Sequence, residues 1–336
     1  MRRSTLLRVL CLGVVCLALG ACAKQSEPGA SSKSPGVFRV VRPKQLTPLS
    51  VLEKQGTLEK SLAPLGLKVE WLEFAAGPQQ LEALNAGALD IASTAESPPI
   101  FAQAAGNSLV YLATTHPSGK AVSLLVKPQA KIETLGDLKG KRVAFQKASI
   151  GHYLLVRGLE SVGLSLNDVT SVFLPPPDAN AAFSEGQVDA WFVWEPFVTR
   201  AVQNGSGKVL VDGGQLRDTA NFITTRREFL EQHRDALQLF VRDLQAAEAW
   251  STAHPREMTE LLAQDLLLDI PTLLEMHAKY DFGILPIDQA VIERQQRVAD
   301  LWHELGFLPG KVDVRRGFLK PEEYAQLIPT PGAAVR

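Results

Sequence analysis

The chain has 336 residues, of which 46% are hydrophobic, and a formal net charge of −1. This length and apolar content can bury a substantial core and suit two domains. The sequence holds no basic block and no interleaving of basic with aromatic residues, which argues against nucleic acid as a partner. All three cysteines, Cys11, Cys16 and Cys22, lie near the start of the chain, so neither disulfides nor cysteine chemistry are predicted for the folded part.

Residues 1–21 have the features of a secretory signal. Three arginines precede an almost wholly apolar run, 9–21, that is too short to span a bilayer permanently. The run ends in Leu-Gly-Ala-Cys, which resembles the lipobox of bacterial lipoproteins and implies a lipid on Cys22. Ordinary cleavage that releases a free protein is the alternative. Residues 22–36 are rich in Ser, Gly and Pro and predict a flexible tether.

Short apolar runs then alternate with helical patterns as far as residue 211. This alternation predicts an α/β protein with parallel sheets flanked by helices. The expected strands are Val37–Val41, Lys68–Glu73, Asp90–Thr94, Leu109–Ala113, Val122–Val126, Arg142–Gln146, Val169–Leu174, Asp189–Val193 and Lys208–Val211.

One eight-residue pattern occurs twice, at 84–91 and at 183–190. In each copy a helical stretch ends at a glycine, Gly87 or Gly186, and the chain enters a strand through an aspartate. Glycine commonly ends helices because it adopts the left-handed conformation at low cost. The two copies indicate two similar α/β lobes.

From about Arg226 onward the sequence predicts helices. Apolar residues recur at helical spacing in 230–244 and again in 291–305, where Leu305 is the last of the series. We interpret these residues as core faces that pack against the first lobe.

Three predicted junctions between a strand and a helix carry polar or aromatic residues. At the first, Ser97 is the expected N-cap and Pro98 the first helical residue, just after Glu96. At the second, Ser149 precedes a helix expected over Ile150–Ser161. The buried face of that helix is expected to comprise Leu154, Leu155, Leu159 and Val162.

The third junction follows the strand at 189–193 and runs through Trp194 and Glu195 into Pro196. Trp191 and Trp194 alternate along this strand, so one should face the core and the other a cleft. Trp194, at the strand end, is the better candidate for contact with a ligand.

Together the junctions predict an anion site between the lobes. Ligands of open α/β sheets bind at the carboxyl ends of strands, where helix N-termini present free N–H groups. Hydrogen bonds to a charged group contribute about 1.5–3 kcal/mol each, so a few of them approach the roughly −8 kcal/mol of a micromolar complex. Such junctions also occur in α/β proteins that bind nothing there. His152, which follows the second junction, is either a ligand contact or a residue of the helix face.

At these segments the sequence resembles the aliphatic sulfonate-binding proteins of ABC importers, which are relatives of the taurine and nitrate binders. The resemblance covers nearly the whole chain after residue 36. The matching segments are Gln79–Asn85, Glu96–Gly106, Asp137–Lys141, Val143–Lys147, His152–Arg157, Leu174–Pro176, Ala181–Phe183, Val188–Trp191, Leu308–Pro309 and Lys311–Asp313.

The resemblance implies a two-lobed type II periplasmic binding protein fold with a helical C-terminal third. Lobe one would comprise 37–120 and 222–336, and lobe two 121–221. The function implied is capture of an aliphatic sulfonate by a lipid-anchored monomer on the periplasmic or cell-surface side. The partner implied is an ABC permease in the inner membrane, with no cofactor and no metal. The implied ligand contacts are Lys44, Gln45, Thr94, Glu96, Ser149, Ile150, Gly151, His152, Trp194 and Glu195.

The sequence departs from the family pattern at several of these positions. Arg42 and Lys44 stand in an altered segment after the first strand and could supply cationic partners to an anion. Glu96 and Glu195 replace shorter aspartates and would repel a bound anion unless a positive group intervenes. These two glutamates therefore either contact donors that close the lobes or face an amine on the ligand, as in taurine.

Three other functions would fit parts of the sequence. Binding of another small anion, such as taurine or nitrate, would use the same scaffold. Against an enzyme, the six histidines are scattered and the sequence contains neither H-E-x-x-H nor G-x-S-x-G. A lipoprotein that presents an interaction surface is the third alternative, which the absence of low-complexity arrays disfavours.

Overall fold

The computed structural model describes residues 36–217, 219–285 and 287–328. The expected signal, the lipidation site Cys22 and the tether, apart from Gly36, lie outside the described residues. Across the described ranges, no helix is both long and apolar enough to cross a membrane.

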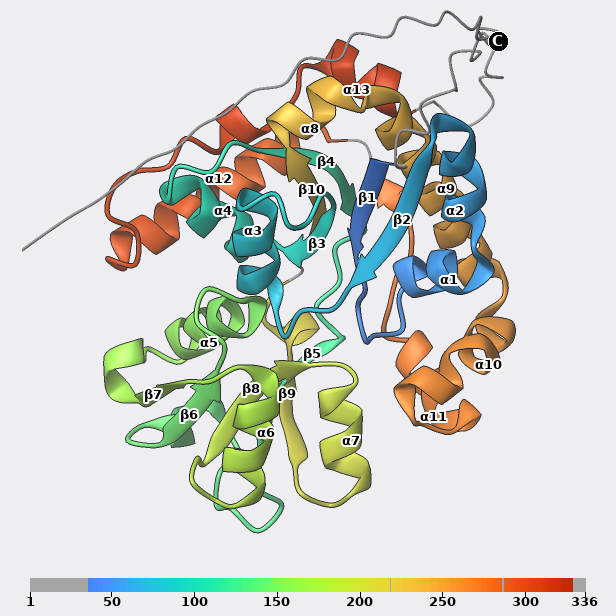
Figure 1. Ribbon diagram of the computed structural model, residues 1–336. Coiled ribbons are helices and arrows are strands. Elements are labelled where there is room, and N and C mark those ends of the chain that lie inside the picture. The colour runs from blue at the N-terminus through green and yellow to red at the C-terminus, as the bar shows by residue number, and fades with distance from the viewer. Residues whose placement is uncertain (1–35, 218, 286, 329–336) are drawn as a thin grey trace, which may run out of the picture. The chain divides into compact units, whose positions relative to one another are not determined.

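Two sheets form the part of the fold that we call the first lobe (Figure 1). A parallel pair joins β1 to β2, and a four-stranded antiparallel sheet has the order β11-β4-β10-β3. An isolated parallel bridge from Val40 to Ile91 links β1 to the segment before β3. The strands are β1 (Gly36–Val41), β2 (Leu67–Leu72), β3 (Ala92–Ala95), β4 (Leu109–Thr115), β10 (Asn221–Arg226) and β11 (Ile284–Leu285).

A five-stranded sheet with the order β7-β6-β8-β5-β9 forms the second lobe. In it β6 runs parallel to β7 and β8, whereas β5 is antiparallel to β8 and β9. The strands are β5 (Val122–Val126), β6 (Arg142–Phe145), β7 (Thr170–Phe173), β8 (Ala190–Trp194) and β9 (Lys208–Asp212).

All nine predicted strands overlap observed strands, but the prediction of parallel sheets is wrong in part. The chain passes from one sheet to the other between β4 and β5 and returns between β9 and β10. Beside these passages, β5 pairs antiparallel with β8 and β9, and β10 pairs antiparallel with β3 and β4. The passages cover 116–121 and 213–220, and we propose them as the boundaries between the lobes.

Helices cover the sheets, and the predicted helical C-terminal third is confirmed. There α9 packs on α1 and α2, and α12 packs on α4, so this third adds to the first lobe. The helices are α1 (Pro48–Gln55), α2 (Thr57–Leu62), α3 (Gly77–Asn85), α4 (Ser97–Ala104), α5 (Ile150–Ser161), α6 (Pro176–Ser184), α7 (Phe197–Gln203), α8 (Arg227–Gln232), α9 (Arg234–Ala253), α10 (Pro255–Leu266), α11 (Ile270–His277), α12 (Gln289–Glu304) and α13 (Pro321–Leu327).

Two apolar residues expected in core faces are instead exposed. Val162 is 44% exposed and Leu305 is 39% exposed. Each is the C-cap residue of its helix, α5 or α12, where the chain turns away from the buried face. The other three residues expected on the buried face of α5 are buried, as predicted: Leu154, Leu155 and Leu159.

The repeated pattern has the same structural role in both lobes. Gly87 and Gly186 follow α3 and α6 with φ of 72° and 75°, in the left-handed region. The next aspartate then accepts a backbone N–H from a neighbouring parallel strand. Asp90 accepts from Arg39 at 2.8 Å, and Asp189 accepts from Arg142 at 2.8 Å. The echo therefore fixes one helix-to-strand corner in each lobe.

Candidate ligand-binding site

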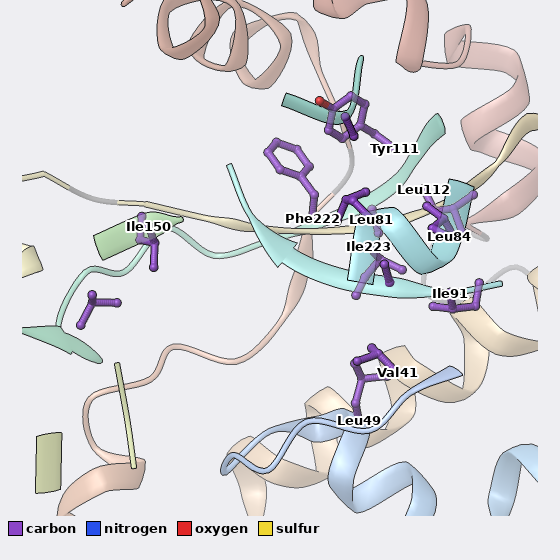
Figure 2. Packing of buried hydrophobic residues seen from close by; sticks show 14 of the residues in the cluster. Val41, Leu49, Leu81, Leu84, Ile91, Tyr111, Leu112, Ile150, Phe222 and Ile223 are labelled. Atoms are coloured by element: carbon purple, nitrogen blue, oxygen red, sulfur yellow. The ribbon is translucent and has the colours of Figure 1, made fainter. Parts of the chain in front are cut away.

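A cavity of about 530 Å³ lies where elements of both lobes meet, a size typical of small-molecule sites. Segments after β1 and β2, the start of α3 and strand β3 line it from the first lobe. The start of α5, the end of β8 and the start of α7 line it from the second lobe. Figure 2 shows four apolar side chains that belong to both the core cluster and the cavity wall: Val41, Leu49, Ile150 and Ile223.

Six of the ten predicted ligand contacts line this cavity and four do not. The six in the wall are Lys44, Gln45, Thr94, Ser149, Ile150 and Trp194. Those outside the wall are Glu96, Gly151, His152 and Glu195. Direct contact of any of the ten with a ligand stays a prediction.

Thr94 presents a hydroxyl that the described residues leave unsatisfied. Its backbone pairs with Phe222 of β10, and its side chain is 4% exposed. Within the described part of the chain, Thr94 Oγ1 has no hydrogen-bond partner. Buried hydroxyls are rarely left without a partner, so this one is available to an oxygen atom of a ligand.

The N-terminus of α3 also lies in the cavity wall. Its N-cap Ala76 has no capping side chain, so the first N–H groups of the helix are left for other partners. A Cβ on Gly77 would lie 2.8 Å from Pro98 Cγ and 3.2 Å from Thr94 Cγ2, which explains the glycine. Sequence reasoning missed this terminus, although the Gly-Pro start after two alanines was a signal for it.

The N-terminus of α5 brings the second lobe to the same cavity. Ser149 Oγ accepts the N–H of His152 at 3.4 Å and donates to the Gln146 carbonyl at 2.7 Å. The cap therefore uses the hydroxyl but leaves the N–H groups of Ile150 and Gly151 at the positive end of a helix of 12 residues. Such a terminus favours a nearby anion.

His152 lies in an aromatic cluster and not in the cavity wall. Its ring is fully buried, with centroids 4.8 Å from Phe145, 4.5 Å from Trp302 and 4.7 Å from Phe307. Burial, followed by the charge of Lys147, lowers the pKa of His152 to about 3. The ring is therefore neutral, and the structure favours the helix-face alternative.

Glu195 joins the two lobes. Its carboxylate accepts the N–H of Thr199 at 3.0 Å and forms an ion pair with Lys279, from the segment after α11. The side chain of Glu195 is 1% exposed. Of the two roles predicted for this glutamate, the structure favours contact with a donor that closes the lobes.

Glu96 is buried beside arginines. It is 1% exposed, and its Oε1 lies 3.8 Å from Arg294 Nε. Burial raises the pKa of Glu96 to about 7, against the opposing charges of Arg217 and Arg294. Glu96 is also the N-cap of α4, so the prediction of Ser97 as N-cap is wrong. Ser97 is instead the first helical residue, and its hydroxyl accepts a hydrogen bond from Trp302 Nε1 at 3.1 Å.

The cations predicted near the ligand are paired within the first lobe. Arg42 Nε lies 2.9 Å from Glu53, and Lys44 Nζ lies 2.7 Å from Glu73. Arg42, Lys44 and Glu73 all line the cavity, so charges of both signs face it.

The C-terminal third contributes wall residues that the sequence analysis did not single out. Glu248 is 6% exposed and accepts the Gly283 N–H at 2.8 Å. Burial raises its pKa to about 7. Tyr280 and Phe282 stack with ring centroids 5.4 Å apart, and Asp281 lies between them in the chain.

The aromatic assignment on β8 is confirmed. Trp191 is 1% exposed and packs in the second core cluster, whereas Trp194 is partly exposed and lines the cavity. With Phe74, Phe197, Tyr280 and Phe282, it gives the cavity an apolar wall beside the donors. Among the residues the structure describes, no group of three or more His, Cys, Asp or Glu side chains is arranged to hold a metal ion.

Two α/β lobes with a cavity between them define the periplasmic binding protein fold, as predicted. The sequence model of the NMT1-like family matches residues 38–266, and the chain belongs to this family. It is 37% identical over 295 residues to an aliphatic sulfonates-binding protein of Escherichia coli (strain K12), which covers 88% of this chain and 92% of the relative.

Solved structures give the same relationship. The alkanesulfonate-binding protein SsuA from Xanthomonas axonopodis pv. citri, bound to MOPS, superimposes with a TM-score of 0.81 at 35% identity. The match covers 86% of this chain and 99% of that one. The predicted resemblance to sulfonate-binding proteins is thus confirmed. The desulfurization enzyme DSZB shares the fold alone, with a TM-score of 0.62 at 16% identity over 87% of this chain and 99% of that one.

Proposed function

We propose that this protein is the substrate-binding component of an ABC importer and captures aliphatic sulfonates between its lobes. The observation that carries the proposal is the unsatisfied Thr94 hydroxyl in the same cavity as the N-termini of α3 and α5. A sulfonate is a single negative charge with three acceptor oxygens, so it requires several N–H and O–H donors more than a dedicated cation. The aromatic wall around Trp194 suits an aliphatic tail.

The proposal also covers the location of the protein and its partner. The chain would be secreted, anchored through lipid on Cys22, and act as a monomer that delivers its ligand to a permease in the membrane. Its similarity to binding proteins over most of its length supports binding without turnover.

A zwitterionic sulfonate is a second candidate, which the acidic part of the wall favours. Glu248 and Asp281 line the same cavity as the donors and could face an amine at the other end of a ligand. They would do so in place of Glu96 and Glu195, which lie outside the wall. Asp281→Asn should then weaken taurine more than an unsubstituted alkanesulfonate.

The test is a thermal-shift and calorimetric comparison of alkanesulfonates, MOPS, taurine, sulfate and nitrate. A ligand at a hundredfold excess over its Kd adds about 2.7 kcal/mol to the free energy of unfolding, which a melting curve detects. Loss of one hydrogen bond to the anion in Thr94→Val should weaken binding by roughly 10–100-fold.

Thr224→Val is the matched control. Thr224 is also a fully buried threonine of the four-stranded sheet whose Oγ1 lacks a partner in the described ranges, but it does not line the cavity. Its replacement should leave sulfonate affinity unchanged. If no sulfonate binds, or if both valine variants bind as the wild type does, the proposal fails.

A further inference from the structure

A second cavity, of about 590 Å³, has four arginines among its lining residues. It is formed by α5 of the second lobe, α12 of the C-terminal third and the two passages between the lobes. Its lining residues are Pro117, Tyr153, Arg157, Arg217, Arg294, Arg297 and Leu301. The two cavities share no lining residue.

In the described part of the chain, the four arginines outnumber the carboxylates that lie within 4.0 Å of them. Within 4.0 Å, the described residues give Arg157 the carboxylate of Glu160, at 2.5 Å, and Arg294 that of Glu96, at 3.8 Å. In the same part of the chain, Arg217 and Arg297 have no carboxylate within that distance. Among the described residues, two of the four guanidinium groups that line the cavity therefore have a carboxylate within 4.0 Å, and neither of those carboxylates lines the cavity.

The positive charges also lie close enough to affect one another. Burial lowers the pKa of Arg217, Glu96 opposes this, and the guanidinium groups of Arg294 and Arg297 lower it further. The guanidinium carbon of Arg217 is held 5.1 Å above the ring centroid of Tyr153, which fixes its position. When like charges lie close together in a concave site, a bound anion reduces the electrostatic repulsion between them.

We propose that this arginine pocket binds a small multivalent oxyanion, of which phosphate and pyrophosphate are the simplest. Guanidinium groups form paired, planar hydrogen bonds with such oxyanions. Arg294 and Arg217 are partly buried and would form the floor of the site, whereas Arg157 and Arg297 are exposed and would form its mouth. A bound anion would connect α5 to α12, and α5 is the helix whose N-terminus lies in the ligand cavity.

The test is a calorimetric titration of the purified protein with sodium pyrophosphate, at constant ionic strength and with no sulfonate present. Constant ionic strength removes general screening as a source of heat. The wild type should give a saturable, one-to-one binding curve. Arg297→Gln, which changes an exposed side chain, should weaken binding by about tenfold or more through loss of a charged hydrogen bond.

Two control variants make the outcome specific. Arg256→Gln removes another exposed helical arginine, in α10 and outside the pocket, and should bind as the wild type does. Trp194→Ala alters the ligand cavity and should also leave pyrophosphate binding unchanged. The proposal is overturned by an unsaturable titration, by equal affinities of the two glutamine variants, or by loss of binding in Trp194→Ala. Because no sulfonate enters the titration, its failure would leave the proposed transport function untouched.

Discussion

At the scale of one residue, the buried carboxyl group of Glu248 makes the stability of the protein depend on pH. The side chain is 6% exposed, and burial raises its pKa from 4.5 to about 7. The folded protein therefore keeps this proton between about pH 4.5 and 7, whereas the unfolded chain has released it. Since the unfolded state binds fewer protons there, the free energy of unfolding falls as pH rises through this window.

Glu248→Gln should remove that dependence while its amide oxygen still accepts the Gly283 N–H. We expect the variant to exceed the wild type in stability by about 1–3 kcal/mol at pH 8 and to match it near pH 4. Urea unfolding at both pH values measures this difference. Asp281→Asn, at a carboxylate of the same wall that is 68% exposed and lies 3.5 Å from His116 Nδ1, is the control and should change the free energy of unfolding by at most about 1 kcal/mol at either pH. A constant difference between Glu248→Gln and the wild type at both pH values would contradict the argument.

Single residues were predictable from the sequence where their surroundings depend on one strand, and not where they depend on distant parts of the chain. Alternation along β8 was enough to separate Trp191 from Trp194, because it depends on one strand alone. The surroundings of Glu96 and Glu195 were not predictable, because their partners Arg294 and Lys279 are distant in the chain. The surroundings of His152 likewise depend on Trp302 and Phe307, which are distant in the chain.

At the scale of elements, the close packing of α5 on β8 sets the position of its N-terminus. A Cβ on Gly151 would lie 2.9 Å from the carbonyl oxygen of Phe192, a backbone atom of β8 that cannot rotate away. Gly151→Ala should therefore shift the helix start and destabilise the fold by about 1–3 kcal/mol. It should also weaken ligand binding, because the N–H groups of the terminus would move away from the cavity.

Gly158→Ala in the same helix is the matched control. There a Cβ would lie 3.4 Å from the nearest atom, Leu216 Cδ1, an ordinary contact. Alanine is favoured over glycine inside a helix by about 0.5–1 kcal/mol, so this variant should be as stable as the wild type or more so. Urea midpoints and calorimetric affinity distinguish the two. Equal stability and affinity in both variants would mean that Gly151 does not fix the helix.

The elements themselves were largely predictable, and their pairing directions were not. Each local run of apolar residues identified a strand, and Ser149 identified the start of α5. Strand β10 was missed, because its sequence, Asn-Phe-Ile-Thr-Thr-Arg, runs directly into the helical third. Its antiparallel pairing with β3 and β4 depends on the return of the chain from the other lobe, which no local pattern contains.

At the scale of the whole molecule, a polar latch joins residues 195–203 of the second lobe, which include α7, to the C-terminal third of the first. The buried carboxylate of Glu195 pairs with Lys279, Arg200 donates to the Leu266 carbonyl at 2.6 Å, and Gln203 donates to Thr272 at 2.5 Å. Because the carboxylate of Glu195 is buried, the loss of its cationic partner should cost more stability than the loss of either of the other two contacts.

Lys279→Met should leave the Glu195 carboxylate buried without its cation and lower the free energy of unfolding by about 1–4 kcal/mol. Adding Glu195→Gln should restore most of the loss, because a neutral amide needs no counter-charge. The comparison variant is Lys139→Met, whose partner Asp168 lies 3.7 Å away and whose side chain is 71% exposed. Exposed pairs of this kind contribute at most about 1 kcal/mol.

Chemical unfolding measures all four proteins, and X-ray scattering without ligand reports whether the lobes separate. We expect Lys279→Met to have the largest radius of gyration, with the double variant close to the wild type. If the double variant is as unstable and as extended as Lys279→Met, the loss comes from the lysine stem and not from the charge. The ion pair would then contribute nothing to holding the lobes together, and the latch would rest on the two neutral acceptors at Leu266 and Thr272.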